Sequence, residues 1–198
     1  MKTSWKMITA AVLLSVVMLL AACSAETPQA AATPAAASAA SAEETGAATG
    51  TFSAVDFDGE EVTEEIFAQA DLTLVNVWAT WCGPCISELP GLEAISRSNI
   101  PGFQVVGIVY DLYDPATGHV DASAFETAEY IEAELSLTYT NIIPDKTLYE
   151  GLLGSLQAFP TTFFVNSEGY LVGDPVVGSQ TEASWEQIIG ERLSESAA

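Results

Sequence analysis

Two nearly continuous apolar runs, 72–78 and 103–110, mark the centre of the chain. Such runs are typical of strands that are buried on both faces of a sheet, and only Asn76 interrupts the first of them. The segments 82–98 and 122–135 carry apolar residues at helical spacing instead. The pattern therefore predicts two strand–helix units in succession.

Shorter elements are predicted on either side of these units. An Asp58-Gly59 step inside 52–62 is typical of a β-hairpin turn. The remaining predicted elements are helical turns over 63–70, a strand over 139–143, a short helix over 146–156, strands over 161–166 and 170–177, and a helix over 181–193. This order indicates an α/β layer structure with a mixed sheet.

Two local signals modify the predicted helices. Pro90 lies inside the helix over 82–98, where it removes one backbone hydrogen bond and is expected to kink the helix. Ser179 and Glu182 have the spacing of a capping box, which predicts the start of the last helix.

The first 23 residues have the form of an export signal. Lys2 and Lys6 precede an apolar run over 7–20, which is shorter than the roughly 20 apolar residues of a membrane-spanning helix. The sequence Leu20-Ala21-Ala22-Cys23 resembles a bacterial lipobox, in which the cysteine is lipidated and becomes the mature N-terminus. We therefore predict a lipoprotein signal peptide over 1–22, while an uncleaved anchor helix is the alternative. Both place the folded part outside the cytoplasm, close to the cell membrane.

A low-complexity segment separates this signal from the folded domain. Residues 23–50 are mostly alanine with Ser, Thr, Pro, Glu and Gly, and they contain no aromatic or large aliphatic side chain. Such a composition cannot offset the entropy cost of ordering the chain. We predict a disordered tether over 23–50, carrying the lipid on Cys23, and one domain over 51–198.

The charge balance is strongly acidic. The chain has 27 Asp and Glu residues, and removal of the signal would leave Arg97, Lys146 and Arg192 as the only strong bases, for a net charge of −24. Such a protein does not bind nucleic acid and is repelled by anionic lipid. Its membrane attachment is then expected to be the lipid anchor, although the acidity also serves simply to keep the domain soluble.

The chain has three cysteines, and two of them carry the candidate chemistry. Cys82 and Cys85 stand three residues apart at the start of a predicted helix, so their sulfurs lie on one side of its first turn and can close a short disulfide. The unpaired N–H groups at a helix start stabilise a thiolate on the first cysteine. The pair therefore indicates thiol–disulfide exchange.

Other chemistry for these polar residues is less favoured. If Cys82 and Cys85 were half of a zinc site, a second Cys or His pair would be needed to complete the coordination, and His119 is the only histidine. Asp111, Asp114 and Asp121 lack the regular spacing of a calcium loop, so solvated acids are favoured there. We expect no bound metal and no cofactor beyond the Cys82–Cys85 disulfide.

The motifs around the cysteines resemble those of the thioredoxin fold. Trp81-Cys82-Gly83-Pro84-Cys85 follows a buried strand, and Phe159-Pro160-Thr161-Thr162-Phe163 stands downstream. The extra hairpin, the insert before the late strands and Glu88-Leu89-Pro90 resemble the TlpA-like and ResA-like extracytoplasmic lipoproteins. The similarity covers residues 51 to about 193. It implies an α/β thioredoxin-like fold, with a central mixed β-sheet flanked by helices and an extra N-terminal β-hairpin.

The resemblance also implies roles for single residues. Cys82 would be the exposed attacking thiolate, and Cys85 the buried thiol that resolves the mixed disulfide. Pro160 would be a cis-proline against the disulfide. The residues that would shape the site or dock the substrate are Trp81, Gly83, Pro84, Phe159, Pro160 and Thr161.

The chain differs from cytoplasmic thioredoxins at one position of the predicted buried strand. Those proteins usually carry an Asp where this chain has Asn76, which cannot take a proton. Glu88 lies three residues past Cys85 on the same helical face and is a candidate for that proton-handling role. The alternative for Glu88 is a solvated helix carboxylate.

Together these residues predict a membrane-tethered thiol–disulfide oxidoreductase, a monomer that reduces exported proteins. A membrane thiol donor of the CcdA or DsbD kind would supply electrons, and candidate clients include apocytochrome c, as in cytochrome c biogenesis, and an oxidised methionine sulfoxide reductase or peroxidase. Oxidation in the reverse direction stays open, because reduction potential sets the direction. The alternatives are a peroxiredoxin, although no arginine lies near Cys82 in sequence, and a binding module with a structural disulfide.

Overall fold

The computed structural model describes residues 47–196. The predicted signal peptide over 1–22, Cys23 and most of the predicted tether lie outside the described residues. Within 47–196, no helix is both long and apolar enough to cross a membrane.

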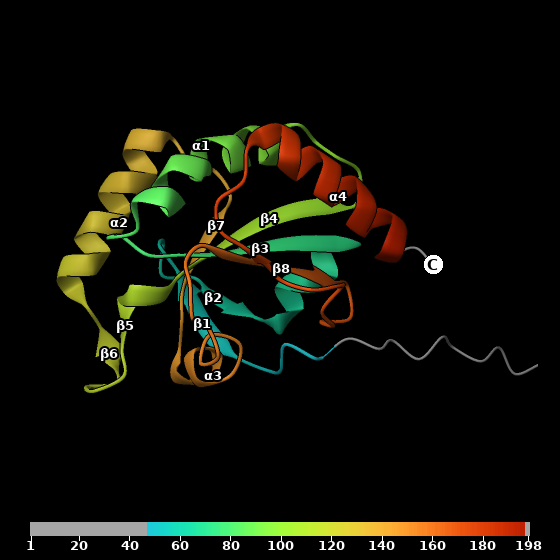
Figure 1. Ribbon diagram of the computed structural model, residues 1–198. Coiled ribbons are helices and arrows are strands. Elements are labelled where there is room, and N and C mark those ends of the chain that lie inside the picture. The colour runs from blue at the N-terminus through green and yellow to red at the C-terminus, as the bar shows by residue number, and fades with distance from the viewer. Residues whose placement is uncertain (1–46, 197–198) are drawn as a thin grey trace, which may run out of the picture. The chain divides into compact units, whose positions relative to one another are not determined.

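A seven-stranded mixed sheet forms the centre of the domain (Figure 1). Its strand order is β2-β1-β7-β4-β3-β8-β9, in which β4 runs parallel to β3 and β7, and the other neighbours are antiparallel. The strands are β1 (Ser53–Asp56), β2 (Glu61–Thr63), β3 (Leu72–Trp78), β4 (Phe103–Val109), β7 (Thr140–Ile143), β8 (Thr161–Asn166) and β9 (Val176–Val177). The mixed sheet and the N-terminal hairpin β1–β2 confirm the predicted fold class.

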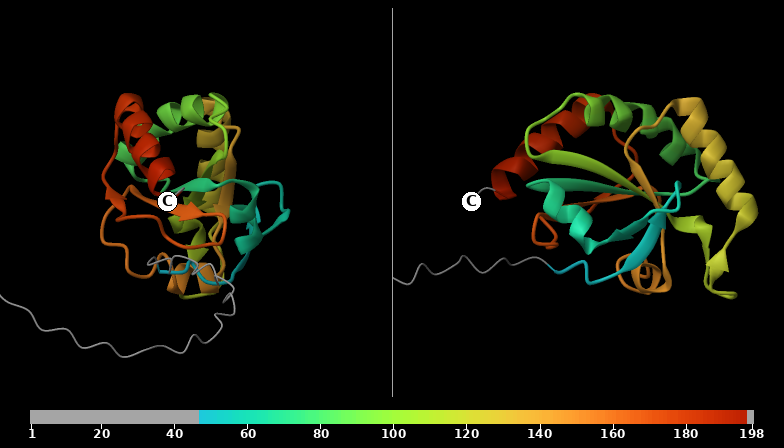
Figure 2. Two further views of the ribbon diagram at one scale, coloured as in Figure 1. Left: turned by 90° about the vertical axis from the view of Figure 1, so that its right-hand side faces the viewer. Right: turned by 180° about the vertical axis from the view of Figure 1, so that it is seen from behind.

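Helices cover both faces of this sheet (Figures 1 and 2). One face packs against α1 (Gly83–Arg97), α2 (Ala122–Leu135) and α4 (Glu182–Ser196). The other packs against the 3₁₀ helix η1 (Glu64–Gln69) and α3 (Lys146–Glu150). The sheet is therefore buried on both sides, as its two apolar runs predict.

The alternation of side chains along β3 decides which residues meet α1. Leu74 and Trp78 pack in the core on the α1 side, whereas Val75 and Val77 pack in the core on the other side. Successive side chains of a strand point to opposite faces, so Asn76 shares the face of Leu74 and Trp78. The Asn76 amide is thus buried on the side of the sheet that packs against α1.

One local prediction differs from the structure. The capping box of Ser179 and Glu182 is wrong: Thr181 Oγ1 instead accepts from the Ser184 backbone N–H (3.2 Å), and α4 begins at Glu182. The Gln180 N–H, which precedes the helix, donates to a carboxylate of α1. α1 continues as a helix on both sides of Pro90, which lies on its exposed side.

The described residues that precede Thr51 lie along a late turn of the domain. Ala48 forms an antiparallel bridge with Tyr170, and Thr49 N–H donates to the Gly169 carbonyl (2.9 Å). A separate two-stranded ribbon, β5 (Tyr113–Asp114) with β6 (His119–Val120), follows the 3₁₀ helix η2 (Tyr110–Leu112).

Candidate active site

The two cysteines form a disulfide at the N-terminus of α1. Cys82 is the N-cap residue of this helix, and the Cys85 N–H donates to Cys82 Sγ (3.3 Å). The Cα atoms of the two residues are 5.3 Å apart. Cys82 is 5% exposed and Cys85 is fully buried, while Gly83 and Pro84 between them are exposed. An N–H at the positive end of a helix stabilises a thiolate. After reduction, this geometry favours the thiolate form of Cys82.

The loop that carries Cys82 is tied to the end of the neighbouring strand. Asp111 in η2 accepts hydrogen bonds from the Thr80 N–H (3.1 and 3.2 Å) and from Thr80 Oγ1 (2.5 Å). Because β3 and β4 run parallel and in register up to Trp78 and Val109, both loops leave the sheet at the same edge. Asp111 therefore holds the turn between β3 and α1 in place.

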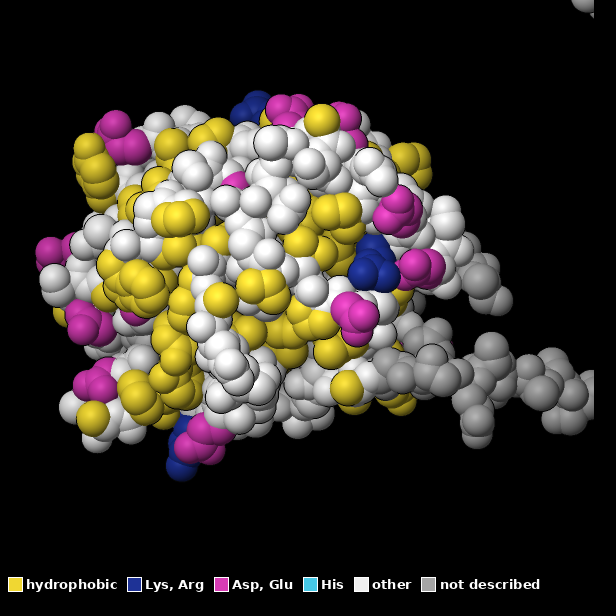
Figure 3. All heavy atoms as spheres, viewed as in Figure 1, with side chains coloured by type: hydrophobic (Ala, Val, Ile, Leu, Met, Phe, Trp, Pro, Cys, Tyr) yellow, Lys and Arg dark blue, Asp and Glu magenta, His cyan; other side chains and the backbone are white. Residues whose placement is uncertain are grey.

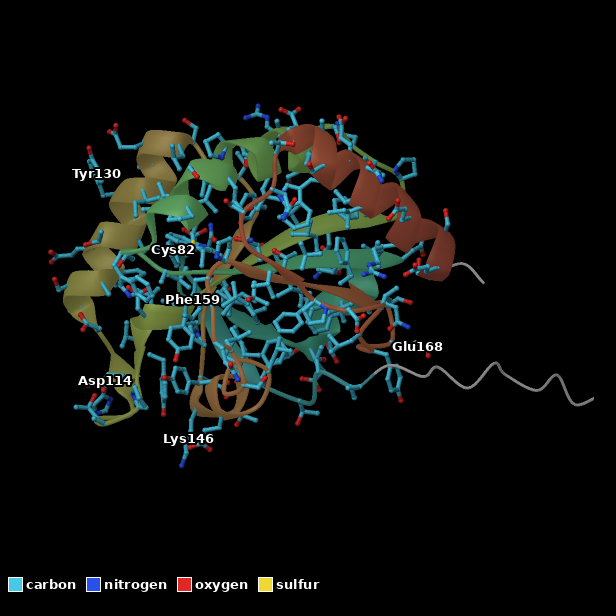
Figure 4. All side chains as sticks on the ribbon, viewed as in Figure 1. Cys82, Asp114, Tyr130, Lys146, Phe159 and Glu168 are labelled. Carbon is cyan, nitrogen blue, oxygen red and sulfur yellow. A yellow bond between two sulfur atoms is a disulfide. The ribbon has the colours of Figure 1, made fainter. Side chains whose placement is uncertain are left out.

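A second loop reaches the same edge from the start of β8. The Phe159-Pro160 peptide bond is cis, Pro160 is buried, and Thr161 lies in the sheet between Val77 and Val177. The Phe159 ring meets the Trp81 ring edge-on, with centroids 5.6 Å apart. Figure 4 shows Phe159 close to Cys82 in that view. The structure thus brings together the two motifs that are 78 positions apart in the sequence.

Glu88 is a buried residue of α1, not a solvated carboxylate. It is 4% exposed, and its two carboxylate oxygens accept hydrogen bonds from Asn76 Nδ2 and from the Gln180 N–H, each 2.9 Å. Asn76 Nδ2 also donates to Thr162 Oγ1 (2.9 Å). This small polar network lies between β3, β8, α1 and the start of α4.

The surroundings of Glu88 raise its pKa above the ordinary value of 4.5. Burial is the largest cause, and the hydrogen bonds from Gln180 and Asn76 offset part of it. The Trp185 indole also acts to lower this pKa, although its Nε1 makes no hydrogen bond of ordinary geometry. A carboxyl group of this kind takes up a proton more readily than one in water.

Sequence reasoning missed several residues around this site. Gln180 carries no recognisable signal, because it reaches Glu88 only through its backbone N–H. Thr162 belongs to the Pro160-Thr161-Thr162 motif, and its place in that motif is the sequence signal that could have identified it. Tyr110 and Tyr149, whose rings lie behind Phe159, appear in sequence only as apolar positions.

The other polar candidates have separate structural uses. Asp121 caps α2 by accepting from the Ser123 and Ala124 N–H groups (2.9 and 3.0 Å). Asp114 accepts from the Ala116 N–H and Thr117 Oγ1 (2.8 Å each), and these bonds lower its pKa. His119 lies exposed in β6. In the part of the chain that the structure describes, no three metal-binding side chains gather into a site.

Comparison with known proteins finds relatives of this chain, although no family model matches it. The chain is 27% identical over 142 residues to the thiol:disulfide interchange protein DsbE of Haemophilus influenzae, covering 70% of each protein. It is also 27% identical over 142 residues to the thioredoxin-like protein YneN of Bacillus subtilis, covering 72% of this chain and 76% of YneN. The thiol-disulfide oxidoreductase ResA of Oceanobacillus iheyensis is 25% identical over 59% of each chain. This chain is a homologue of the DsbE-type and ResA-type thioredoxin-like thiol–disulfide oxidoreductases.

The solved structures agree on the fold of this oxidoreductase. A thiol:disulfide interchange protein of the thioredoxin family from Chlorobium tepidum superposes with a TM-score of 0.61 at 22% identity. That match covers 77% of this chain and 99% of the other. The predicted fold is therefore confirmed, and the relatives above bear out the predicted resemblance and enzyme class.

Proposed function

We propose that this oxidoreductase is tethered to the outer side of the cell membrane and reduces disulfides in exported proteins through Cys82 and Cys85. The observation that carries the proposal is the asymmetry of the pair. Cys82 caps α1 and accepts the Cys85 N–H, whereas Cys85 is fully buried one turn inside the helix. Attack by Cys82 and resolution by Cys85 follow from this asymmetry.

The proposed reaction begins from the reduced dithiol. The Cys82 thiolate attacks one sulfur of the client disulfide, forming a mixed disulfide and releasing the first client thiolate, which takes a proton. Cys85 then loses its proton and attacks Cys82 Sγ, releasing the second client sulfur as a thiolate that is also protonated. Two electrons pass to the client, and the Cys82–Cys85 disulfide is left. A dithiol donor must reduce this disulfide before the next cycle.

Glu88 is the proposed acceptor of the Cys85 proton. It is buried on the same helix three residues further on, and burial raises its pKa, so that it takes up a proton more readily than a carboxyl group in water. Asn76 and Gln180 orient the carboxylate through their hydrogen bonds. This assignment is part of the proposal and is tested separately below.

The proposed client contact lies at the edge that contains Phe159. Thr161 already occupies a sheet position between two strands, while Phe159 precedes the strand and has its ring against Trp81. Trp81 is 65% exposed next to a nearly buried Cys82, which suits a side chain that contacts the client. Gly83 and Pro84 complete the exposed turn around the sulfur.

The proposed cellular setting rests on the N-terminal sequence. Lys2, Lys6, the apolar run over 7–20 and the lipobox ending at Cys23 support export and lipid anchoring. A membrane dithiol donor of the CcdA or DsbD kind and exported clients, with apocytochrome c among the candidates, fit that setting. Labelling of the full-length chain with a radioactive fatty acid in a bacterial host, with Cys23→Ser as the control, tests the anchor.

The catalytic proposal is tested by reduction of insulin disulfides with dithiothreitol as the electron source. The wild-type domain is expected to accelerate the reaction, and Cys82→Ser to abolish the acceleration. Equal turnover by the two proteins would overturn the proposal. Cys85→Ser lacks the resolving thiol and is expected to accumulate mixed disulfides in cells, which identifies the clients by their masses.

A further inference from the structure

A continuous row of five aromatic rings extends from the active site across the domain. The Phe159 ring lies between Trp81 and Tyr110, with centroid distances of 5.6 and 4.7 Å. Tyr110 then contacts Tyr149 (5.2 Å), which contacts Tyr113 (5.1 Å). In Figure 3, hydrophobic side chains gather around the place where Figure 4, in the same view, labels Phe159.

The rings of this aromatic row come from separate elements, so the tertiary structure alone assembles it. Tyr110 begins η2 directly after β4, Tyr149 lies in α3, and Phe159 lies in the loop before β8. Trp81 lies in the turn that Asp111 holds through Thr80. Tyr110 is thus adjacent to the residue that fixes the Trp81 turn, and its own ring supports Phe159.

A hydrogen bond fixes the middle of the aromatic row. The hydroxyl oxygens of Tyr110 and Tyr149 are 2.9 Å apart, and both side chains are half-buried. This bond is the main cause that raises the pKa of Tyr110 to about 12, so the Tyr110 hydroxyl stays neutral over the physiological range. Rings that meet at such distances and angles attract each other and resist displacement.

We propose that Tyr110 is a positioning residue for client binding. Held by Tyr149, it keeps the Phe159 ring against Trp81, so that Trp81 and Phe159 present a preformed apolar surface beside Cys82. The occupant of that surface is the stretch of polypeptide that flanks the client disulfide. The inference rests on the proposed exchange function and states how the client chain is held, not how the sulfurs react.

The position of the row explains why the occupant is a polypeptide. The Phe159 ring meets the exposed Trp81 ring next to Cys82, and Cys82 itself has only 5% of its surface exposed. A small disulfide can meet Cys82 without extending over Trp81 and Phe159. A protein disulfide brings several flanking residues, which must lie on the surface next to the sulfur.

Tyr110→Leu tests the proposal because it removes the ring contact with Phe159 and keeps an apolar side chain. With insulin as substrate, KM is expected to rise about fivefold, the size expected for the loss of one aromatic contact, while kcat changes less than about twofold. With bis(2-hydroxyethyl) disulfide, which has no flanking chain, the rate is expected to stay unchanged. Tyr110→Phe retains the ring and is expected to restore most of the insulin KM.

Two controls make the experiment decisive. Tyr130→Leu changes a tyrosine of α2 that is 64% exposed and lies outside the aromatic row, and it is expected to leave both substrates unaffected. Tyr149→Leu removes the ring that contacts Tyr110, is expected to raise the insulin KM in the same direction, and tests the row should Tyr110→Leu fail to fold. Equal slowing of both substrates by Tyr110→Leu, or an unchanged insulin KM in a folded Tyr110→Leu or Tyr149→Leu variant, overturns the positioning role. Failure of the wild type to reduce either disulfide overturns the proposed function itself.

Discussion

Asn76 and Glu88 are joined across the interface between β3 and α1 by a hydrogen bond of 2.9 Å from Asn76 Nδ2 to Glu88 Oε1. Asn76 is the polar position of an otherwise apolar strand face, and Glu88 lies buried on the helix opposite it. An amide at the strand position donates to the carboxylate without competing for its proton. The proposed mechanism therefore assigns proton exchange in this network to Glu88.

Glu88→Gln is expected to slow disulfide exchange by roughly 10- to 100-fold, at or below the lower end of general-base effects. Glutamine keeps the size of the side chain and can accept one of the two hydrogen bonds, but it cannot take a proton from Cys85. Stopped-flow measurement of insulin reduction by the reduced domain gives the rate. The matched control is Glu186→Gln in α4, whose side chain is exposed, and it should retain the wild-type rate. An unchanged rate in Glu88→Gln would rule out its proton-accepting role.

The pH dependence of stability follows from the same carboxyl group. Its pKa in the folded state is raised above 4.5, chiefly by burial, so the folded state binds more protons than the unfolded state between the two pKa values. The free energy of unfolding of the oxidised wild type is therefore expected to fall as the pH rises from about 4.5 through the raised pKa, relative to Glu88→Gln. Burial also raises the pKa of Glu132, but Glu132 is present in both proteins and cancels in the difference.

Urea unfolding of the oxidised wild type and of Glu88→Gln at several pH values between 4 and 8 measures this difference. The wild type should lose stability relative to the variant and level off above the raised pKa. Parallel curves would show that Glu88 keeps an ordinary pKa in the folded state.

Asp111→Ala is expected to destabilise the domain by about 1–3 kcal/mol, the cost of leaving a partly buried donor without its partner. It removes the acceptor for both the N–H and the hydroxyl of Thr80. Asp114→Ala is the matched control, since Asp114 also accepts one N–H and one hydroxyl, but both of these hydrogen bonds are exposed to solvent. Urea unfolding should show a clearly smaller loss of unfolding free energy for Asp114→Ala. Equal losses would contradict the stabilising role of the hydrogen bonds between Asp111 and Thr80.

Gly107→Ala is expected to destabilise the domain by roughly 1–3 kcal/mol through overpacking. A Cβ at this position in β4 would meet Asn141 Oδ1 and, at 3.2 Å, Trp78 Nε1, which are hydrogen-bonded to each other (3.1 Å). Gly190→Ala in α4 is the control, because a Cβ there meets nothing within 4 Å and alanine is the better helix former. Thermal unfolding should lower the midpoint for Gly107→Ala and leave or raise it for Gly190→Ala.

Much of the fold could be predicted because its signals are local. The apolar run over 72–78 is strand β3 with the predicted bounds, and the helical spacing over 122–135 is α2 with the predicted bounds. The errors occur where distant residues intervene. The predicted capping box lies at a segment whose Gln180 N–H donates to Glu88, which lies 92 positions earlier in the chain, and α4 begins only after this contact.

The chemistry of the disulfide could be predicted from the sequence, because the spacing of Cys82 and Cys85 at a helix start is a local property. The surroundings of that disulfide could not be predicted in this way. Burial of the Glu88 side chain against β3, and the packing of Phe159 between Trp81 and Tyr110, depend on segments that meet only when the sheet is complete. Desolvation and ring contacts are set by such neighbours, so no local pattern of residues encodes them.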